Sequence, residues 1–508
     1  MPTRSDKHGA AAERVFYPGF NGGLNLSQAA ENIERNELKE ALNVAFSPVM
    51  GSMRTRGGLV WSGRLPFEIS GGAPVTDRGF LLRKKGARNA CYFRWNGVWT
   101  VRGDFSGDGP VSAAAWGDDT LLVASGGKLQ RFDPYGASGL PKLSNIAGAP
   151  GNCRAVFVRN GRVGVVTMNS DDGHYDTIRF SAVGDCENWT NDPNDDSSAQ
   201  FLEVGYMDGM DVDAVVPLSK DLIVFKSPEN EPDKGVVWRL TGDFPDWQLL
   251  EAAHQTGTFW QESVQTVGSD AFFLTTAGLA TLSSVAAYGE IKTSWPDRKV
   301  ANAMSRRLTA DARLWNIAVK EQLWVLPGGG DDDPEKKKIW VFDYGRGIWT
   351  QFEFPSVPDF AAIVDNMLFV IIGGSVYQVH DEYIRDEIYR TEPVLIRARM
   401  RMGVILRGLQ TLIKAAFASF CSPPSSSAGL RLRGFTLPLR GGGRRDFAAG
   451  EPSAGIYASA DARPLFPNNG VTTARQRCVV RGWAVTPELE ITGGAFSIHT
   501  AGLETVEA

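Results

Sequence analysis

The sequence predicts an all-β fold organised around a β-propeller, and three observations carry that prediction. Glycine occurs 56 times in 508 residues, which favours many turns and therefore many short strands. Fourteen tryptophans suit pleated sheet surfaces, where aromatic side chains pack well. Short apolar stretches joined by tight turns recur at roughly 40 to 50 residues, the period of a propeller blade. A chain of this length should also form two or three domains.

The N-terminal segment, residues 16–61, opens the fold with a turn and two extended stretches. Gly22-Gly23 tolerates the positive φ of a tight turn, and residues 24–27 alternate apolar and polar side chains as in a half-buried strand. Apolar residues at nearly helical spacing predict a helix over residues 27–44. A second extended stretch follows at residues 54–61. The segment therefore predicts a β-α-β entry unit.

Hairpins follow between Gly79 and His380. One of the clearest, residues 155–166, has Asn160-Gly161 at its centre, a turn whose twist matches that of the flanking strands. We count about six blades, and a pair of β-sandwiches is the alternative architecture. The hairpin stretches are residues 91–101, 121–133, 155–166, 222–240, 271–282, 322–343 and 367–379.

The hairpin rhythm ends after His380, which places a domain boundary near residue 390. Residues 431–439 alternate apolar and polar side chains, and residues 476–499 do so most clearly, as expected for a compact antiparallel sheet. We expect the two ends of the chain to form one platform with the propeller inserted between them, because neither end has enough strands to bury a core alone. The predicted regions are the N-terminal platform segment (1–65), the propeller (66–390) and the C-terminal β domain (391–508).

No catalytic constellation is visible in the sequence. The five histidines are scattered, and the chain has no HExxH, GxSxG, P-loop or dinucleotide-binding motif. The five cysteines form no CxxC pair, which argues against a zinc site or a disulfide framework. Acidic loops at residues 191–196 and 331–333 lack the ligand spacing of an EF-hand. We therefore expect no enzyme activity, no cofactor and no metal, and we assign no catalytic, cofactor-binding or metal-ligating residue.

Charge is divided unevenly along the chain. Residues 1–390 carry a formal net charge of −11, and the remainder carries +6. This split argues against a general nucleic-acid binder, which would place positive charge where phosphates lie. The polar N-terminus has no apolar signal-peptide core, and Arg407 and Lys414 interrupt the most apolar stretch, residues 404–421. Neither a signal peptide nor a membrane span is expected.

Several short motifs span most of the chain in a fixed order. They are Gly22-Gly23-Leu24, Asn43-Val44, Arg54-x-Arg56-Gly57-Gly58, Phe180-Ser181, Asn188-Trp189 and the Arg-rich strand 475–483. This order resembles that of the tail hub and nozzle proteins of short-tailed bacteriophages, also called packaged-DNA stabilisation proteins. Residues 404–450 depart from the family pattern.

The resemblance implies a structural virion protein in the phage tail, assembled in the cytoplasm of a host bacterium. It implies a homo-oligomeric ring, a hexamer, that attaches below the portal-adaptor ring, helps to retain packaged DNA and forms the conduit for ejection. Tail fibres, spikes or a tail needle are further implied partners, and double-stranded DNA passes through. Candidate channel-lining residues are acidic and turn-like, namely Asp208, Asp211, Asp213, Asp331, Asp332 and Asp333.

Two other functions stay open. One is a propeller that binds carbohydrate or hydrolyses glycosides, and the other is a cytoplasmic propeller scaffold. A hydrolase would need two carboxylates placed across the mouth of the propeller. The acidic body of the chain suits a conduit better, because a lumen that attracted phosphates would hold DNA by many charge-assisted contacts.

Overall fold

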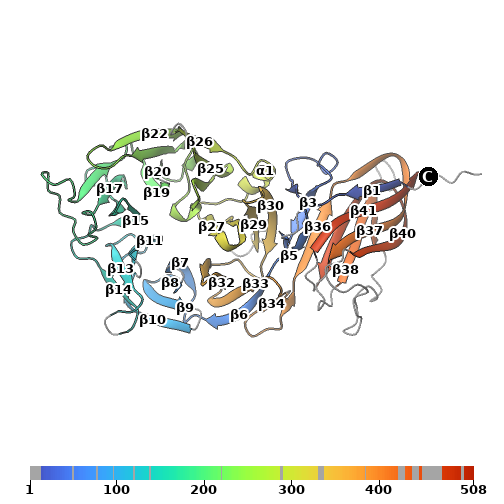
Figure 1. The fold of residues 1–508 in the computed structure, drawn as a ribbon, viewed down its shortest axis with the longest axis horizontal. Helices are drawn as coiled ribbons and strands as arrows, with labels where there is room; N and C mark the ends of the chain where they lie inside the picture. The colour runs from blue at the N-terminus through green and yellow to red at the C-terminus, as the bar shows by residue number, and fades with distance from the viewer. Residues whose placement is uncertain are drawn as a thin grey trace, which may run out of the picture.

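The computed structural model describes residues 13–47, 51–75, 78–94, 97–117, 120–136, 139–218, 220–285, 290–329, 337–383, 385–421, 429–437, 445–448, 472–492 and 497–507. Figure 1 shows a ring of small sheets with a platform of longer strands beside it. The predicted all-β propeller with an added antiparallel platform is confirmed. Among the described residues the sole α-helix is α1 (Ala301–Ser305), and none of them forms a helix long and apolar enough to cross a membrane.

Seven four-stranded blades form the ring, one more than the six counted in the sequence. The first strands of the blades contact one another in a closed circle around the axis. Blade 1 holds β7 (Ile69–Val75), β8 (Gly79–Lys84), β9 (Asn89–Arg94) and β10 (Gly97–Asp104); blade 2 holds β11 (Ser112–Trp116), β12 (Thr120–Ala124), β13 (Gln130–Asp133) and β14 (Lys142–Asn145); blade 3 holds β15 (Cys153–Arg159), β16 (Arg162–Thr167), β17 (Thr177–Phe180) and β18 (Gln200–Glu203).

The next three blades follow the same plan. Three short 3₁₀ turns, η2 (Pro232–Lys234), η3 (Gln261–Ser263) and η4 (Ala318–Lys320), lie in their connections. Blade 4 holds β19 (Asp211–Leu218), β20 (Asp221–Ser227), β21 (Val236–Thr241) and β22 (Gln248–His254); blade 5 holds β23 (Val264–Val267), β24 (Asp270–Thr275), β25 (Gly278–Val285) and β26 (Glu290–Ser294); blade 6 holds β27 (Arg313–Ile317), β28 (Gln322–Leu326), β29 (Lys338–Asp343) and β30 (Ile348–Glu353).

Blade 7 closes the ring with strands from both ends of the propeller. β31 (Phe360–Val364), β32 (Met367–Ile372) and β33 (Ser375–His380) are joined by β6 (Gly58–Arg64), which pairs antiparallel with β33. Residues 58–64 therefore belong to the propeller, and their expected place in the platform segment 1–65 is corrected. The closure satisfies backbone groups along the outer edge of β33 that would otherwise lie open.

The hairpin turn expected at Asn160-Gly161 is confirmed. Arg159 at the end of β15 lies opposite Arg162 at the start of β16, so the two residues between them form the whole turn. Asn160 and Gly161 have φ values of 50° and 72°. Positive φ at both central positions gives the turn type whose twist matches that of antiparallel strands.

The helix expected over residues 27–44 does not form. β3 (Glu37–Leu42) and β4 (Val44–Phe46) occupy the second half of that stretch. β3 pairs antiparallel with β36 (Arg397–Met402), which lies far away in the sequence, and both ends of β3 are buried. Pairing with a distant strand thus decides the conformation, and the helical spacing of the apolar residues does not.

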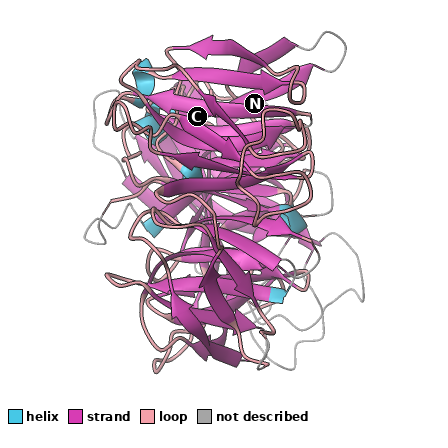
Figure 2. Ribbon diagram, turned by 90° about the vertical axis from the view of Figure 1, so that its left-hand side faces the viewer, coloured by secondary structure: helices cyan, strands magenta, loops and turns pink. Residues whose placement is uncertain are grey.

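The platform joins both ends of the chain in one sheet, and Figure 2 shows how far strands dominate the described residues. Two stretches within residues 404–450, which depart from the family pattern, are strands of this sheet, namely residues 405–421 and 429–437. β1 (Glu13–Tyr17) and β5 (Met53–Thr55) pair with β41 (Ser497–Glu507); β2 (Gly23–Leu24) lies parallel to β3; β40 (Thr472–Thr492) pairs with β37 (Ile405–Cys421), β36 and β38 (Gly429–Leu437); β38 pairs with β39 (Arg445–Ala448).

One hydrophobic core runs from the platform into blades 5 and 6. It includes Met400 of β36, Phe272 of β24 and Trp349 of β30, all buried. Gly23 on β2 shows how closely the two parts pack. A Cβ atom at this position would lie 1.9 Å from Cγ2 of Ile348 on β30. The platform therefore packs directly onto blade 6.

Candidate functional site

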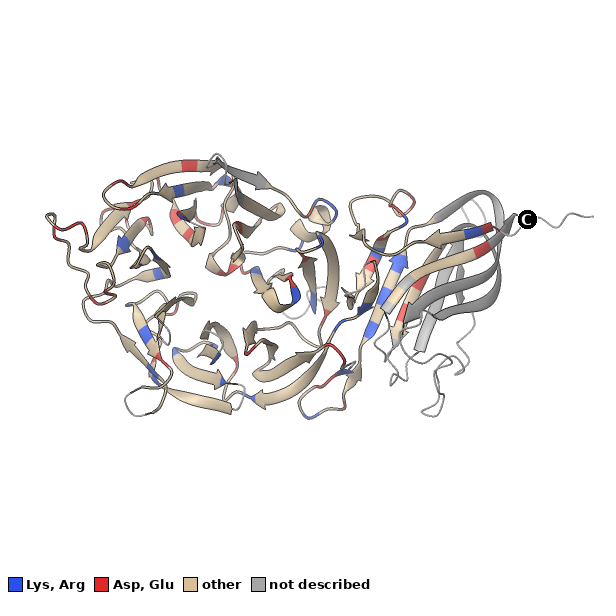
Figure 3. Ribbon diagram, in the orientation of Figure 1, with Lys and Arg blue, Asp and Glu red and all other residues tan. Residues whose placement is uncertain are grey.

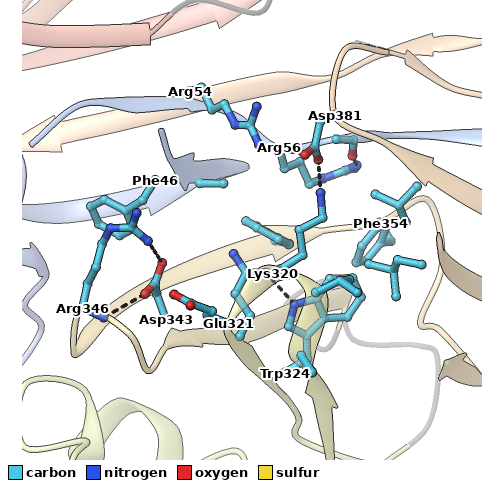
Figure 4. Close-up of a pocket in the computed structure, with 18 residues that line it drawn as sticks. Phe46, Arg54, Arg56, Lys320, Glu321, Trp324, Asp343, Arg346, Phe354 and Asp381 are labelled. Atoms are coloured by element: carbon cyan, nitrogen blue, oxygen red, sulfur yellow. Dashed lines mark hydrogen bonds and ion pairs between the residues drawn. The ribbon is translucent and has the colours of Figure 1, made fainter. Parts of the chain in front are cut away.

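A cavity of about 390 Å³ lies at the junction between the platform and the propeller. Phe46 and Arg54 line it from β4 and β5. Trp324 on β28 and Asp381 after β33 line it from the propeller (Figure 4). Its volume is within the range of small-molecule pockets. Charged side chains of both signs meet aromatic rings here, and both parts of the molecule contribute to the walls.

Arg56 is the most extensively bonded residue of this junction. Its side chain is 2 % exposed. Nη1 and Nη2 bind the two carboxylate oxygens of Asp386 at 3.0 and 2.6 Å. Nε donates to Oδ1 of Asn43 at 3.0 Å, and the other two donors bind the carbonyl oxygens of Gly57 and Glu353. All five N–H groups therefore have acceptors, which offsets the cost of burying the charge.

Asn43 connects the same junction to the platform. Its φ of 55° ends β3, in a conformation that asparagine adopts more readily than most residues. Oδ1 accepts a hydrogen bond from the backbone nitrogen of Glu353 at 2.8 Å, and Nδ2 donates to the carbonyl oxygen of Arg397 at 3.0 Å. Asn43 thus links β30 of blade 6 to β36 of the platform.

Asp381 lies between two cations at the cavity. Nη2 of Arg54 on the platform lies 2.8 Å from Asp381, and Lys320 of blade 6 donates a further hydrogen bond to it. Burial acts to raise the pKa of Asp381, but the hydrogen bond from Lys320 and the charge of Arg54 outweigh it. The pKa of this carboxyl is therefore lowered, and Asp381 holds the platform against blade 6 as an anion.

Asp343 and Arg346 form another ion pair, at 2.9 Å, at the turn between β29 and β30. Burial raises the pKa of Asp343, Arg346 opposes the shift and nearby Glu321 adds to it. The guanidinium of Arg346 also lies 5.9 Å from the centre of the Phe46 ring on β4. This pair therefore contacts the platform as well.

These contacts indicate what the arrangement can do chemically. The carboxylates of Asp343, Asp381 and Asp386 are each held by at least one cation, so none is arranged as a free general base. In the part of the chain that the structure describes, no group of three or more His, Cys, Asp or Glu side chains could hold a metal ion. The geometry fits best with a rigid joint between platform and propeller.

Three of the acidic residues singled out in the sequence, Asp208, Asp211 and Asp213, lie elsewhere, between blades 3 and 4. Both carboxylate oxygens of Asp208 accept hydrogen bonds from the ammonium group of Lys226, at 2.8 and 2.9 Å. Lys226 is fully buried and also donates to the carbonyl oxygens of Val204 and Gly205. Asp208 therefore serves as the counter-ion of a buried lysine.

Asp211 and Asp213 lie at the start of β19, facing blade 3. Oδ1 of Asp211 lies 3.1 Å from Nδ1 of His174, and Arg154 of β15 reaches Asp211 at 3.4 Å and Asp213 at 3.5 Å. Asp213 is the extra residue of a β-bulge and accepts a hydrogen bond from Ser227. Its side chain is buried, so we withdraw Asp213 as a residue that lines a water-filled lumen. Asp208 and Asp211 stay predictions, and Asp331, Asp332 and Asp333 lie outside the described residues.

Stability should depend on pH through Asp213. Burial raises the pKa of Asp213 to about 7, although Ser227 and Arg154 act to lower it. Because the native state holds this proton more tightly than the unfolded state, stability is lost as pH rises from about 4 towards 7. We expect the free energy of unfolding of the Asp213→Asn variant to fall less steeply with rising pH than that of the unmodified protein, by up to about 1.4 kcal/mol per pH unit. Urea unfolding between pH 4 and 7 checks it, and equal slopes for both proteins would contradict it.

Asp381 and Asp386 could not be singled out from the sequence. Asp381 lies 327 residues from Arg54, and Asp386 lies 330 residues from Arg56. No local spacing connects partners so far apart. The one available signal was the Arg54-x-Arg56 motif itself, since arginines that become buried need carboxylates or carbonyl oxygens as partners.

Comparison with known proteins supports no family assignment. No protein-family model and no curated protein sequence matches the chain. BamB from Moraxella catarrhalis is similar at 13 % identity and a TM-score of 0.35, over 64 % of this chain and 97 % of that structure. YCF48 from Cyanidioschyzon merolae gives 13 % and 0.38, over 64 % and 98 %. Regucalcin from Agrobacterium tumefaciens gives 12 % and 0.35, over 67 % and 98 %. Similarities this distant carry no argument about function.

Proposed function

We propose that this propeller protein is a structural subunit of the tail of a short-tailed bacteriophage. As a hub or nozzle, it would form a homo-oligomeric ring, most simply a hexamer, below the portal-adaptor. The ring would help to retain packaged DNA and would form the conduit through which the DNA leaves. In this proposal the chain has no catalytic role, and its partners are the adaptor ring and the tail fibres, spikes or needle.

The observation that carries this proposal is the position of the resembling motifs. Gly23, Asn43 and Arg56 all lie where the platform meets the propeller. A subunit that resists the outward force of packaged DNA needs its parts held rigidly. The shared core and the buried Arg56–Asp386 pair provide such a connection. These motif residues are therefore ones on which the rigidity of a ring subunit would depend.

The distribution of charge is compatible with a conduit of low affinity for DNA. Part of the positive charge of the C-terminal region is neutralised within the subunit, since Arg399 and Arg401 on β36 lie 3.3 and 2.8 Å from Glu40. Figure 3 shows Lys and Arg positions next to Asp and Glu positions on the platform strands nearest the propeller. Arg397 lies on the same face of β36 and is exposed. An exposed cation on the platform can steer and register a partner ring of opposite charge.

The proposal is tested by an electron cryomicroscopy map of the assembled particle. We expect a ring whose lumen is lined mainly by acidic and neutral side chains. A lumen lined chiefly by Lys and Arg would contradict the conduit, because such a surface would bind DNA tightly. Turnover of glycosides that is abolished by replacing one propeller carboxylate would contradict the non-catalytic role and favour the hydrolase alternative.

A further inference from the structure

One exposed apolar patch lies on blade 3 and is surrounded by acidic residues. Phe201 and Met207 are 59 % and 57 % exposed, and Tyr206 lies between them in the chain. The hydroxyl of Tyr206 lies 3.5 Å from the carboxylate of Asp171. Desolvation raises the pKa of Tyr206, and the charges of Asp171 and Glu203 raise it further. We call Phe201, Tyr206, Met207, Asp171 and Glu203 the acidic patch.

The backbone of this patch is also unusual. Met207 has a φ of 55°, although it is neither glycine nor asparagine. A non-glycine residue in this region carries strain, and such residues are concentrated at functional surfaces. The turn thus holds a large apolar side chain in solvent at a conformational cost.

A second exposed patch lies on blade 7, where two arginines outnumber one carboxylate, that of Glu387, which accepts a hydrogen bond from the backbone nitrogen of Trp61 at 2.7 Å. Trp61 on β6 is 44 % exposed and stacks on Tyr389, with 5.9 Å between ring centres. The guanidinium groups of Arg64 and Arg390 lie 4.5 and 5.1 Å from the centre of the Tyr389 ring. Hydrogen bonds from Arg390 and Arg64 lower the pKa of Tyr389. We call Trp61, Tyr389, Arg64 and Arg390 the basic patch.

The two patches lie on well-separated blades of the ring. Blades 3 and 7 are separated by three blades on one side of the ring and by two on the other. Figure 1 accordingly shows β17 of blade 3 at the left edge of the propeller and β6 at its lower edge. The patches therefore cannot meet within one chain, whereas two copies can bring them together.

We propose that the acidic patch of one copy docks on the basic patch of the next, in a head-to-tail contact between copies of this chain. Opposite charges around two apolar centres provide both the steering and the burial that a specific interface needs. A heterologous contact of this kind leaves one patch free at each end, so it propagates and closes into a ring if the rotation allows. The inference deepens the proposed function, because it names the subunit interface of the ring.

The test uses two variants of the full-length protein that leave the cores untouched. The acidic-patch variant carries Phe201→Thr and Met207→Asn, because threonine suits a strand and asparagine tolerates positive φ. The basic-patch variant carries Trp61→Thr and Arg64→Glu. The matched control is Leu250→Thr, an exposed apolar residue on the outer strand of blade 4 that belongs to neither patch. Circular dichroism and the melting temperature establish that each variant is folded.

Native mass spectrometry and sedimentation then report self-association. We expect the unmodified protein and the control to assemble, and each patch variant to associate roughly tenfold more weakly or worse. An equimolar mixture of the two variants should give pairs and nothing larger, because only one intact acidic and one intact basic patch can meet. Assembly of the unmodified protein should also weaken as salt is raised.

Three results would overturn the inference, and they separate it from the proposed function. Patch variants that assemble like the unmodified protein would place the interface elsewhere and leave the ring intact. Mixed variants that fail to pair, or that form larger species, would exclude a head-to-tail contact. An unmodified protein that stays a single chain at every concentration and salt would overturn both the contact and the ring.

Discussion

Replacing Arg56 by methionine is expected to lower the free energy of unfolding by about 3–5 kcal/mol. The substitution leaves Asp386 buried without its cation and removes five hydrogen bonds at the joint between platform and propeller. Urea unfolding measures the loss. Hydrogen exchange should show that protection falls first in β3 and β36, the platform strands that Asn43 connects to the propeller.

Two further variants serve as the control and the rescue for this prediction. Arg399→Met removes an ion pair whose arginine is 33 % exposed, and we expect it to cost less than about 1 kcal/mol. Combining Arg56→Met with Asp386→Asn should recover part of the loss, because the second substitution removes the uncompensated charge. A loss below about 1 kcal/mol for Arg56→Met alone would show that the joint does not depend on the buried pair.

Replacing Gly23 by alanine should cost about 2–5 kcal/mol, from the sum of two effects. The φ of 64° at this position disfavours any side chain, and the new methyl group would lie 1.9 Å from Cγ2 of Ile348. β2 would then have to move away from β30, and the platform would separate from blade 6. The melting temperature and the exchange protection of β2 and β30 both report this change.

Gly86→Ala is the matched control for the backbone effect. Gly86 has a φ of 70°, but nothing lies within 4 Å of a Cβ atom there, so only about 1 kcal/mol is expected. The double variant Gly23→Ala, Ile348→Ala should lose less stability than the sum of the losses in the two single variants, because Ile348→Ala removes the clash. Strict additivity, or equal costs at both glycines, would contradict the close packing of β2 on β30.

The repeated part of the fold could be predicted from the sequence because it depends on local contacts. A hairpin such as β15–β16 is specified by its own alternation and by the turn at Asn160-Gly161, and neither needs a distant partner. The propeller class followed from the repetition of such hairpins. The number of blades could not be predicted in this way, because the last blade is completed by β6 from the opposite end of the propeller segment.

The platform and the candidate site depend on distant contacts, which a single sequence does not reveal. Residues 37–42 have apolar side chains at helical spacing, yet they form a strand because β36 pairs with them. The joint brings Arg56 together with Asp386 across 330 residues. Of the acidic residues chosen for their turn-like surroundings, Asp208 forms an ion pair with the buried Lys226, a partner that the sequence did not indicate.

The central claim is that this chain is a ring-forming structural subunit, and the mass of the native particle tests it most directly. Native mass spectrometry of the full-length protein, at low salt and over a range of concentrations, should show one closed species, most simply six chains. Electron micrographs of that species should show a ring with an open centre. A particle that remains a single chain under all these conditions would contradict the ring and the tail function that depends on it.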